Sequence, residues 1–214
     1  MKWFKIEKKI KPSTGKYYSD WKDHLAEEAK GQCVYCTIHL NPFGGIRNFH
    51  VEHYKPKSVQ AFKHLEHDYN NLFLACSICN CFKGADWPNE PNDLLDIKCY
   101  PDPTVVDYST LFEVNSDYTL SGTKFASKYM VTKLFLNRPQ LQLERKAFAL
   151  YQEIKEVFNN LKDLINQLKA MTKEQGLSES EALLYKTMIK TVEFTLLQNE
   201  EKFIVPYITA QITK

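Results

Sequence analysis

Two cysteine pairs constrain this chain more than any other feature. Cys33 and Cys36 form one Cys-x-x-Cys pair, Cys76 and Cys79 form another, and 39 residues separate them. Together the pairs supply the four thiolates of a tetrahedral zinc site. The separation exceeds that of an ordinary zinc ribbon, so the pattern predicts structural zinc that closes both ends of an inserted unit. A single pair would leave a redox or an accidental origin open, and His39, three residues after Cys36, is an alternative zinc ligand.

The composition is that of a globular protein in a reducing compartment. Of 214 residues, 43% are apolar and 25% are charged. No apolar run is long enough to cross a membrane, and the first residues lack the apolar stretch of a secretory signal, so we expect a cytoplasmic protein with reduced thiols. Residues 1–84 carry 13 Lys and Arg against 8 Asp and Glu. This excess suits a nucleic-acid backbone but equally a solvated basic surface, so charge alone decides nothing.

Composition and periodicity divide the chain into four parts. Residues 1–32 are a basic segment with a helix predicted from Ser19 to Lys30. Residues 33–84 hold both cysteine pairs and form the zinc-stabilised core. Residues 85–122 are rich in Pro, Asp and Asn, which predicts a covering loop followed by a hairpin of residues 111–114 and 118–121. Residues 123–214 are predicted to be helical.

The helical part contains three predicted helices. They run from Phe125 to Leu136, from the Asn137-Arg138-Pro139 start to about Met171, and from Ser178 to Phe203. The second helix carries apolar residues at alternating steps of three and four from Tyr151 to Leu168, and the third carries an apolar set at Leu183, Leu184, Met188, Val192, Leu196 and Leu197. Such stripes favour an antiparallel helical hairpin, and the alternative is that part of this surface docks a partner protein. Both can hold at once.

The segment between the cysteine pairs has the order strand, excursion, strand, helix. Residues 49–54 alternate, which places His50 and Glu52 on one face of a strand and His53 on the other. Residues 72–75 form a short apolar strand that can pair with the first, and residues 77–84 look like a short helix. Cys81 and Cys99 have no partner by spacing, so we expect both to be buried as small apolar residues.

These residues resemble the HNH nuclease, or ββα-metal, motif. Glu-His on a first strand precedes Asn-Leu before a second strand, and Cys-x-x-Cys-Asn-x-x-Lys follows on a helix. The motif therefore falls on Glu52, His53, Asn71, Asn80 and Lys83. A lone His-x-Glu-His sequence on a strand usually consists of exposed residues without a functional role. This ordered set of residues on two zinc knuckles instead favours a nuclease. The expected fold class is α+β, mostly α, with a ββα-metal core clamped by zinc and a helical C-terminal region.

The resemblance implies a role for each matched residue. His53 would be the general base, and Glu52 with Asn80 would bind one catalytic cation, Mg²⁺ or Mn²⁺, because carboxylate and amide oxygens are hard ligands. Asn71 would fix the loop that presents His53, and Lys83 would lie near the phosphate or the leaving group. Asp is commoner than Glu at position 52. His50 is a further candidate, either as a ligand or as a phosphate contact.

A longer set of motifs resembles one HNH family. Residues 51–58, 71–76, 80–84 and 136–145 are similar to the PtuB proteins of retron and Septu antiphage systems. That resemblance implies a nucleic-acid substrate, either DNA or a structured RNA such as tRNA. It also implies an ABC-type ATPase partner, PtuA, and, in a retron system, a reverse transcriptase with its multicopy DNA–RNA. Two other functions are open: a non-catalytic zinc-knuckle module that binds nucleic acid, and a stand-alone restriction-like nuclease.

Overall fold

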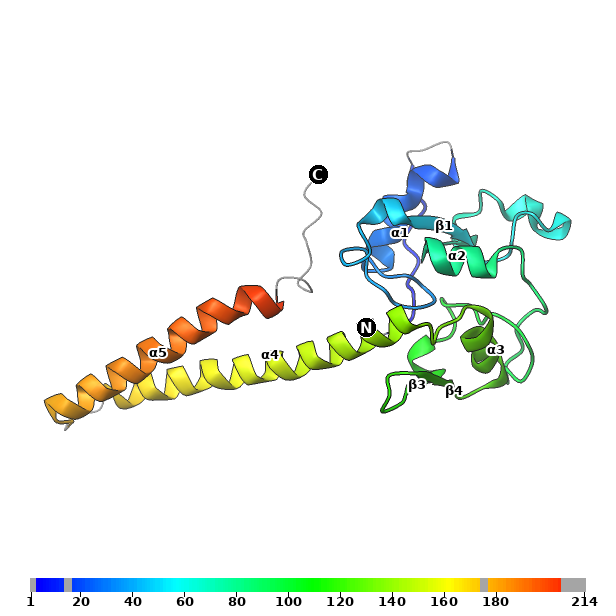
Figure 1. Ribbon diagram of the computed structural model, residues 1–214. Coiled ribbons are helices and arrows are strands. Elements are labelled where there is room, and N and C mark those ends of the chain that lie inside the picture. Colours follow the sequence, from blue (N-terminus) through cyan, green and yellow to red (C-terminus); the bar gives the residue numbers. More distant parts are fainter. Residues whose placement is uncertain (1–2, 14–16, 174–176, 205–214) are drawn as a thin grey trace. The chain divides into compact units, whose positions relative to one another are not determined.

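The chain divides into two compact units, residues 1–146 and 147–214. The computed structural model describes residues 3–13, 17–173 and 177–204, with side chains as far as residue 198 (Figure 1). Unit 1 contains every residue of the predicted site, and unit 2 contains most of the long C-terminal helices.

An antiparallel strand pair and one short helix form the centre of unit 1. Strand β1 (Phe49–His53) pairs with β2 (Leu72–Cys76), so that His53 lies opposite Leu72. All five residues of β2 are buried, which explains its unbroken apolar sequence. Helix α2 (Ser77–Lys83) follows directly and contacts both strands. It ends at Gly84, whose φ of +52° is a conformation that glycine adopts without strain.

The N-terminal segment packs against this strand pair. A 3₁₀ turn, η1 (Tyr18–Trp21), leads into α1 (Lys22–Glu28), which contacts β1 and β2. The predicted helix from Ser19 to Lys30 is therefore too long at both ends. Gly31 has a φ of +70°, and a Cβ added there would lie 2.7 Å from His39 Nε2, so the chain must turn at a glycine.

Short helices and a hairpin complete unit 1. The 3₁₀ turns η2 (Ile46–Asn48), η3 (Gln60–Leu65) and η4 (Tyr69–Asn71) flank the strands, and none of them was predicted. The irregular segment after α2 ends in η5 (Tyr108–Thr110). Strands β3 (Phe112–Val114) and β4 (Leu120–Gly122) form the predicted hairpin, and α3 (Phe125–Lys133) packs against β4. The prediction extended α3 three residues too far.

Unit 2 is a helical hairpin. Helix α4 (Pro139–Met171) begins in unit 1 and continues into unit 2, where α5 (Glu179–Ile204) follows. Phe158 and Ile165 of α4 belong to one buried cluster with Ile189 and Leu196 of α5. The two helices therefore pack as the predicted hairpin. The face of α5 differs from the prediction, because the predicted stripe residues Leu183, Leu184, Met188 and Leu197 are exposed.

The expected α+β class is confirmed, with helix outweighing strand. Cys99 is buried as predicted, whereas Cys81 is exposed. The prediction for Cys81 was wrong because this position of α2 faces outward, whereas Cys79, two residues earlier, lies in the buried core. Within the described part of the chain, no helix combines the length and the apolar character that crossing a membrane requires.

Candidate functional site

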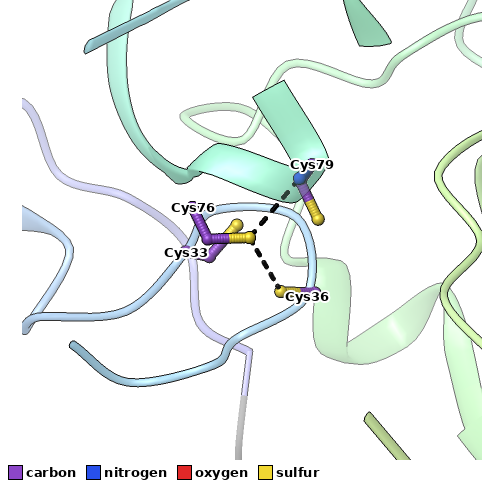
Figure 2. A group of neighbouring side chains, drawn as sticks. All are labelled: Cys33, Cys36, Cys76 and Cys79. Carbon is purple, nitrogen blue, oxygen red and sulfur yellow. Dashed lines mark hydrogen bonds between the residues drawn. The ribbon is translucent and has the colours of Figure 1, made fainter. Parts of the chain in front are cut away.

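The four paired cysteines lie together in the interior of unit 1. The sulfurs of Cys33, Cys36, Cys76 and Cys79 are all within 4.8 Å of one another, and all four residues are buried (Figure 2). Cys36 Sγ lies 3.8 Å from Cys76 Sγ. A tetrahedron with zinc–sulfur bonds of about 2.3 Å has sulfur–sulfur edges of about 3.8 Å. A disulfide would need about 2 Å. The donor set therefore fits a structural zinc ion.

Local backbone contacts hold the two cysteine pairs in place. The first pair is tied to the sheet because Val34 N donates to Leu74 O at 2.9 Å. The second pair spans the start of α2, where Cys79 N donates to Cys76 Sγ at 3.4 Å. His39, the alternative ligand, instead accepts a hydrogen bond from Asn41 N through Nδ1, and the described cluster consists of four cysteines.

His53 lies at the end of β1 beside a surface pocket of about 480 Å³. Its Nε2 is 3.0 Å from Glu66 O, and its ring meets the Tyr18 ring edge-on at a centroid distance of 4.7 Å. A carbonyl oxygen can only accept, so Nε2 carries the proton and Nδ1 holds the lone pair. Burial lowers the pKa of His53 below its ordinary value. A neutral imidazole with a basic Nδ1 is the form that a general base requires.

Asn71 links the end of β1 to the segment that follows. Its Oδ1 accepts from Lys55 N at 2.8 Å, and its Nδ2 donates to Lys55 O at 3.0 Å and to Leu65 O at 3.3 Å. Its own carbonyl accepts from Tyr54 N. One buried amide thus satisfies both backbone polar groups of Lys55 and fixes the chain directly after His53.

Glu52 and Lys83 form a buried ion pair under the strand. Lys83 Nζ lies 2.7 Å from Glu52 Oε1, and the exposed fractions of their side chains are 0% and 3%. Tyr35 donates to the same oxygen at 3.2 Å, and Lys83 also donates to His53 O at 3.0 Å. Burial raises the pKa of Glu52, and the nearby Lys83 ammonium opposes that rise.

This arrangement differs from the phosphate contact expected of Lys83. Its ammonium is enclosed by a carboxylate and a β1 carbonyl, because α2 brings the lysine under the strand. The lysine therefore neutralises Glu52 and holds the backbone of His53. Both contacts with Glu52 reach Oε1, and Glu52 is not among the residues that line the pocket of His53 and Asn80.

Asn80 and His50 meet at the pocket wall. Asn80 Nδ2 is 3.1 Å from His50 Nδ1, so Oδ1 is the amide atom that a hard cation would take. Strand alternation predicted that His53 would face away from His50, but both line the same pocket. The difference arises because β1 ends at His53, whose ring turns toward Tyr18 and Glu66.

The oxygens of Glu52 and Asn80 suit Mg²⁺ or Mn²⁺ in type, yet they are only two ligands. Three or more His, Cys, Asp or Glu side chains that lie close together could hold a metal ion by themselves, and among the described residues the four cysteines form such a group. Water and substrate oxygens would therefore occupy the remaining coordination positions of a catalytic cation, as is common in Mg²⁺ sites.

Several further pocket residues were not predicted as site residues, and three of them are Tyr18, Lys22 and Lys57. Tyr18 and Lys22 come from the N-terminal segment, and Lys57 follows β1. Lys57 Nζ lies 2.8 Å from both Tyr18 Oη and Glu66 Oε1. Lys57 stands shortly after the Glu-His pair in the sequence, and this position could have suggested it as a site residue. The sequence gives no comparable signal for Lys22, which only α1 packing brings to the pocket.

Comparison with known proteins agrees with this geometry. Residues 33–86 match the model of the HNH endonuclease family, so this part of the chain is an HNH endonuclease domain. The match spans both cysteine pairs, β1, β2 and α2. Neither the curated proteins nor the solved structures that were compared gave a significant match.

Proposed function

We propose that this protein is a metal-dependent endonuclease that hydrolyses phosphodiester bonds of nucleic acid. The observation that carries the proposal is the state of His53 within an HNH domain: its Nε2 is bound to Glu66 O, it lines an open pocket, and its pKa is lowered. Lys22 of the same pocket supplies a positive charge that suits a phosphate group, whereas the charge of Lys57 is paired with Glu66.

We assign the steps of this reaction to named atoms. His53 Nδ1 takes a proton from water as the water oxygen bonds to phosphorus, and the bond from phosphorus to the leaving oxygen breaks. Asn80 lines the pocket, and with Glu52, as the resemblance implies, it would hold the divalent cation, which would neutralise charge on the phosphate and the leaving oxygen. Asn71 and Lys83 are positioning residues, because both act on the backbone around His53.

His50 has a supporting role in this proposal. Its contact with Asn80 Nδ2 orients the amide so that Oδ1 faces away from the histidine ring. His50 is exposed, so it can also contact a bound phosphate. We place it as a positioning residue for Asn80, and His50→Ala should weaken cation binding more than it slows the step at saturating cation.

The test is cleavage by the purified full chain with Mg²⁺ or Mn²⁺, using plasmid DNA and tRNA as separate substrates. His53→Ala should abolish cleavage while zinc content and circular dichroism stay unchanged. His64→Ala is the matched control, since His64 is exposed on η3 and does not line the pocket. Undiminished cleavage by His53→Ala would refute the assignment.

The same experiment separates the alternative functions. A non-catalytic zinc-knuckle module would bind nucleic acid without dependence on Mg²⁺ and would produce no strand breaks at any excess of protein. A stand-alone restriction-like nuclease would cleave specific sites as the isolated chain. The proposed effector of a larger complex should instead require its partner for full activity.

We further propose that the nuclease serves a cytoplasmic antiphage system with an ABC-type ATPase, PtuA, and, where that system is a retron, a reverse transcriptase with its multicopy DNA–RNA. The resemblance of residues 51–58 and 136–145 to PtuB proteins supports this context. Unit 2 offers a docking surface, because α4 exposes leucines and a valine beside its packed stripe. The test is co-purification of the tagged chain from its native operon: a large ATPase should be recovered, and its absence would count against this context.

A further inference from the structure

We propose that Arg138 is an outer-sphere residue of the zinc site, whose guanidinium donates hydrogen bonds to three of the four zinc-binding thiolates. No role was predicted for this residue beyond its place at the start of α4. The proposal rests on the zinc assignment of the four cysteines and is independent of nuclease activity.

The geometry is specific to three sulfurs. Arg138 Nη2 lies 3.7 Å from Cys36 Sγ, 3.8 Å from Cys79 Sγ and 4.0 Å from Cys76 Sγ. Its Nη1 lies 3.8 Å from Cys79 Sγ. In the described structure, Cys33 is the member of the cluster that Arg138 does not reach. One planar guanidinium therefore covers a single side of the cluster.

The charge of the cluster gives a reason for this contact. Four thiolates and one Zn²⁺ carry a net charge of about −2, and all four cysteines are buried. A charge that is removed from water needs a partner of opposite sign or hydrogen-bond donors. Arg138 supplies both, because its guanidinium is always charged and presents several N–H groups in one plane. A lysine in its place would supply the charge but would reach fewer sulfurs.

The contact also joins segments that are distant in sequence. Arg138 immediately precedes α4 and lies 59 residues beyond Cys79. It also donates to Leu134 O at 3.3 Å and Phe135 O at 3.4 Å, which are carbonyls directly after α3. The same side chain thus binds the zinc cluster and the junction between α3 and α4, so loss of zinc should loosen that junction.

Hydrogen bonds to a thiolate withdraw electron density from sulfur and lower its nucleophilicity. The first test compares zinc transfer to a chelator from the intact protein, R138Q, R138K and the control R47Q. Arg47 is exposed, so R47Q removes one guanidinium without touching the cluster. We expect R138Q to lose about 10–100-fold in zinc affinity, R138K to lose less, and R47Q to match the wild type. Equal affinity of R138Q and wild type would overturn the proposal.

A second measurement excludes a merely structural effect through the carbonyls directly after α3. With zinc saturating, limited alkylation followed by mass spectrometry reports which cysteine reacts first. Loss of Arg138 should increase the fraction of molecules in which Cys36, Cys76 or Cys79 is the first cysteine alkylated, with a smaller change at Cys33. The cobalt-substituted protein should show its thiolate-to-metal charge-transfer band at lower energy. General loosening would expose all four cysteines alike without moving the band, and that result would refute an outer-sphere role. Because R138K retains the charge, it provides the same readouts if R138Q does not fold.

Discussion

The buried pair of Glu52 and Lys83 allows a quantitative test of how the site is held. Lys83→Met removes the ammonium while keeping most of the side-chain volume, and it leaves the Glu52 carboxylate buried with Tyr35 as its remaining donor. Removing one partner of a buried ion pair typically costs about 3–5 kcal/mol. Both side chains here are almost fully enclosed and their charged atoms are 2.7 Å apart. We therefore expect unit 1 to lose about 3–5 kcal/mol of stability at pH 7.

The sign of the pH dependence follows from the protonation of Glu52. Without Lys83, burial raises the pKa of the folded carboxyl above that of the unfolded chain. The deficit of the variant is then full at pH values above the folded pKa, and it shrinks as the pH falls through that value and Glu52 becomes neutral. Glu52→Gln combined with Lys83→Met removes the unpaired charge, so the double variant should be more stable than Lys83→Met alone.

The assay is urea denaturation followed by tryptophan fluorescence. Trp3, Trp21 and Trp87 all belong to unit 1, so the signal reports this unit rather than the helical hairpin. A loss below about 1 kcal/mol for Lys83→Met would place the pair among weak surface ion pairs. A double variant no more stable than the single one would show that unpaired charge is not the cause. Either result would refute the reasoning.

Three other predictions concern the zinc, the base and the loop. Removal of zinc by a strong chelator should cost unit 1 on the order of 10 kcal/mol and abolish its near-ultraviolet circular dichroism, and added zinc should restore the signal. Because the pKa of His53 is lowered, the acid limb of kcat/KM should have its midpoint below the ordinary 6.5; a midpoint above 6.5 would contradict this. Asn71→Ala leaves both polar groups of Lys55 unpaired and should cost about 2–4 kcal/mol in a thermal or urea unfolding assay.

The spacing of residues along the sequence was sufficient to predict those features that residues close together in the sequence define. The two Cys-x-x-Cys pairs predicted the cysteine cluster, because two thiols three positions apart can reach one ion wherever the pair is placed. The apolar stripe of α4 predicted the hairpin of unit 2, because helical periodicity fixes which side chains share a face, whereas the buried face of α5 was decided by packing. The HNH segment was likewise recognisable, since its residues stand in a fixed order over a short stretch.

The tertiary structure decided how these residues are used. Alternation along a strand could not show that His53 turns into the same pocket as His50, because the strand ends at that residue. Charge pattern could not show that Lys83 faces inward to Glu52, because a lysine is normally solvated and only α2 packing encloses it. Arg138 contacts Cys36 across 102 residues, and such a contact leaves no periodic trace in the sequence. The sequence by itself determined the chemistry available to the protein, whereas long-range packing decided which groups face the pocket, which are neutralised and which support the metal site.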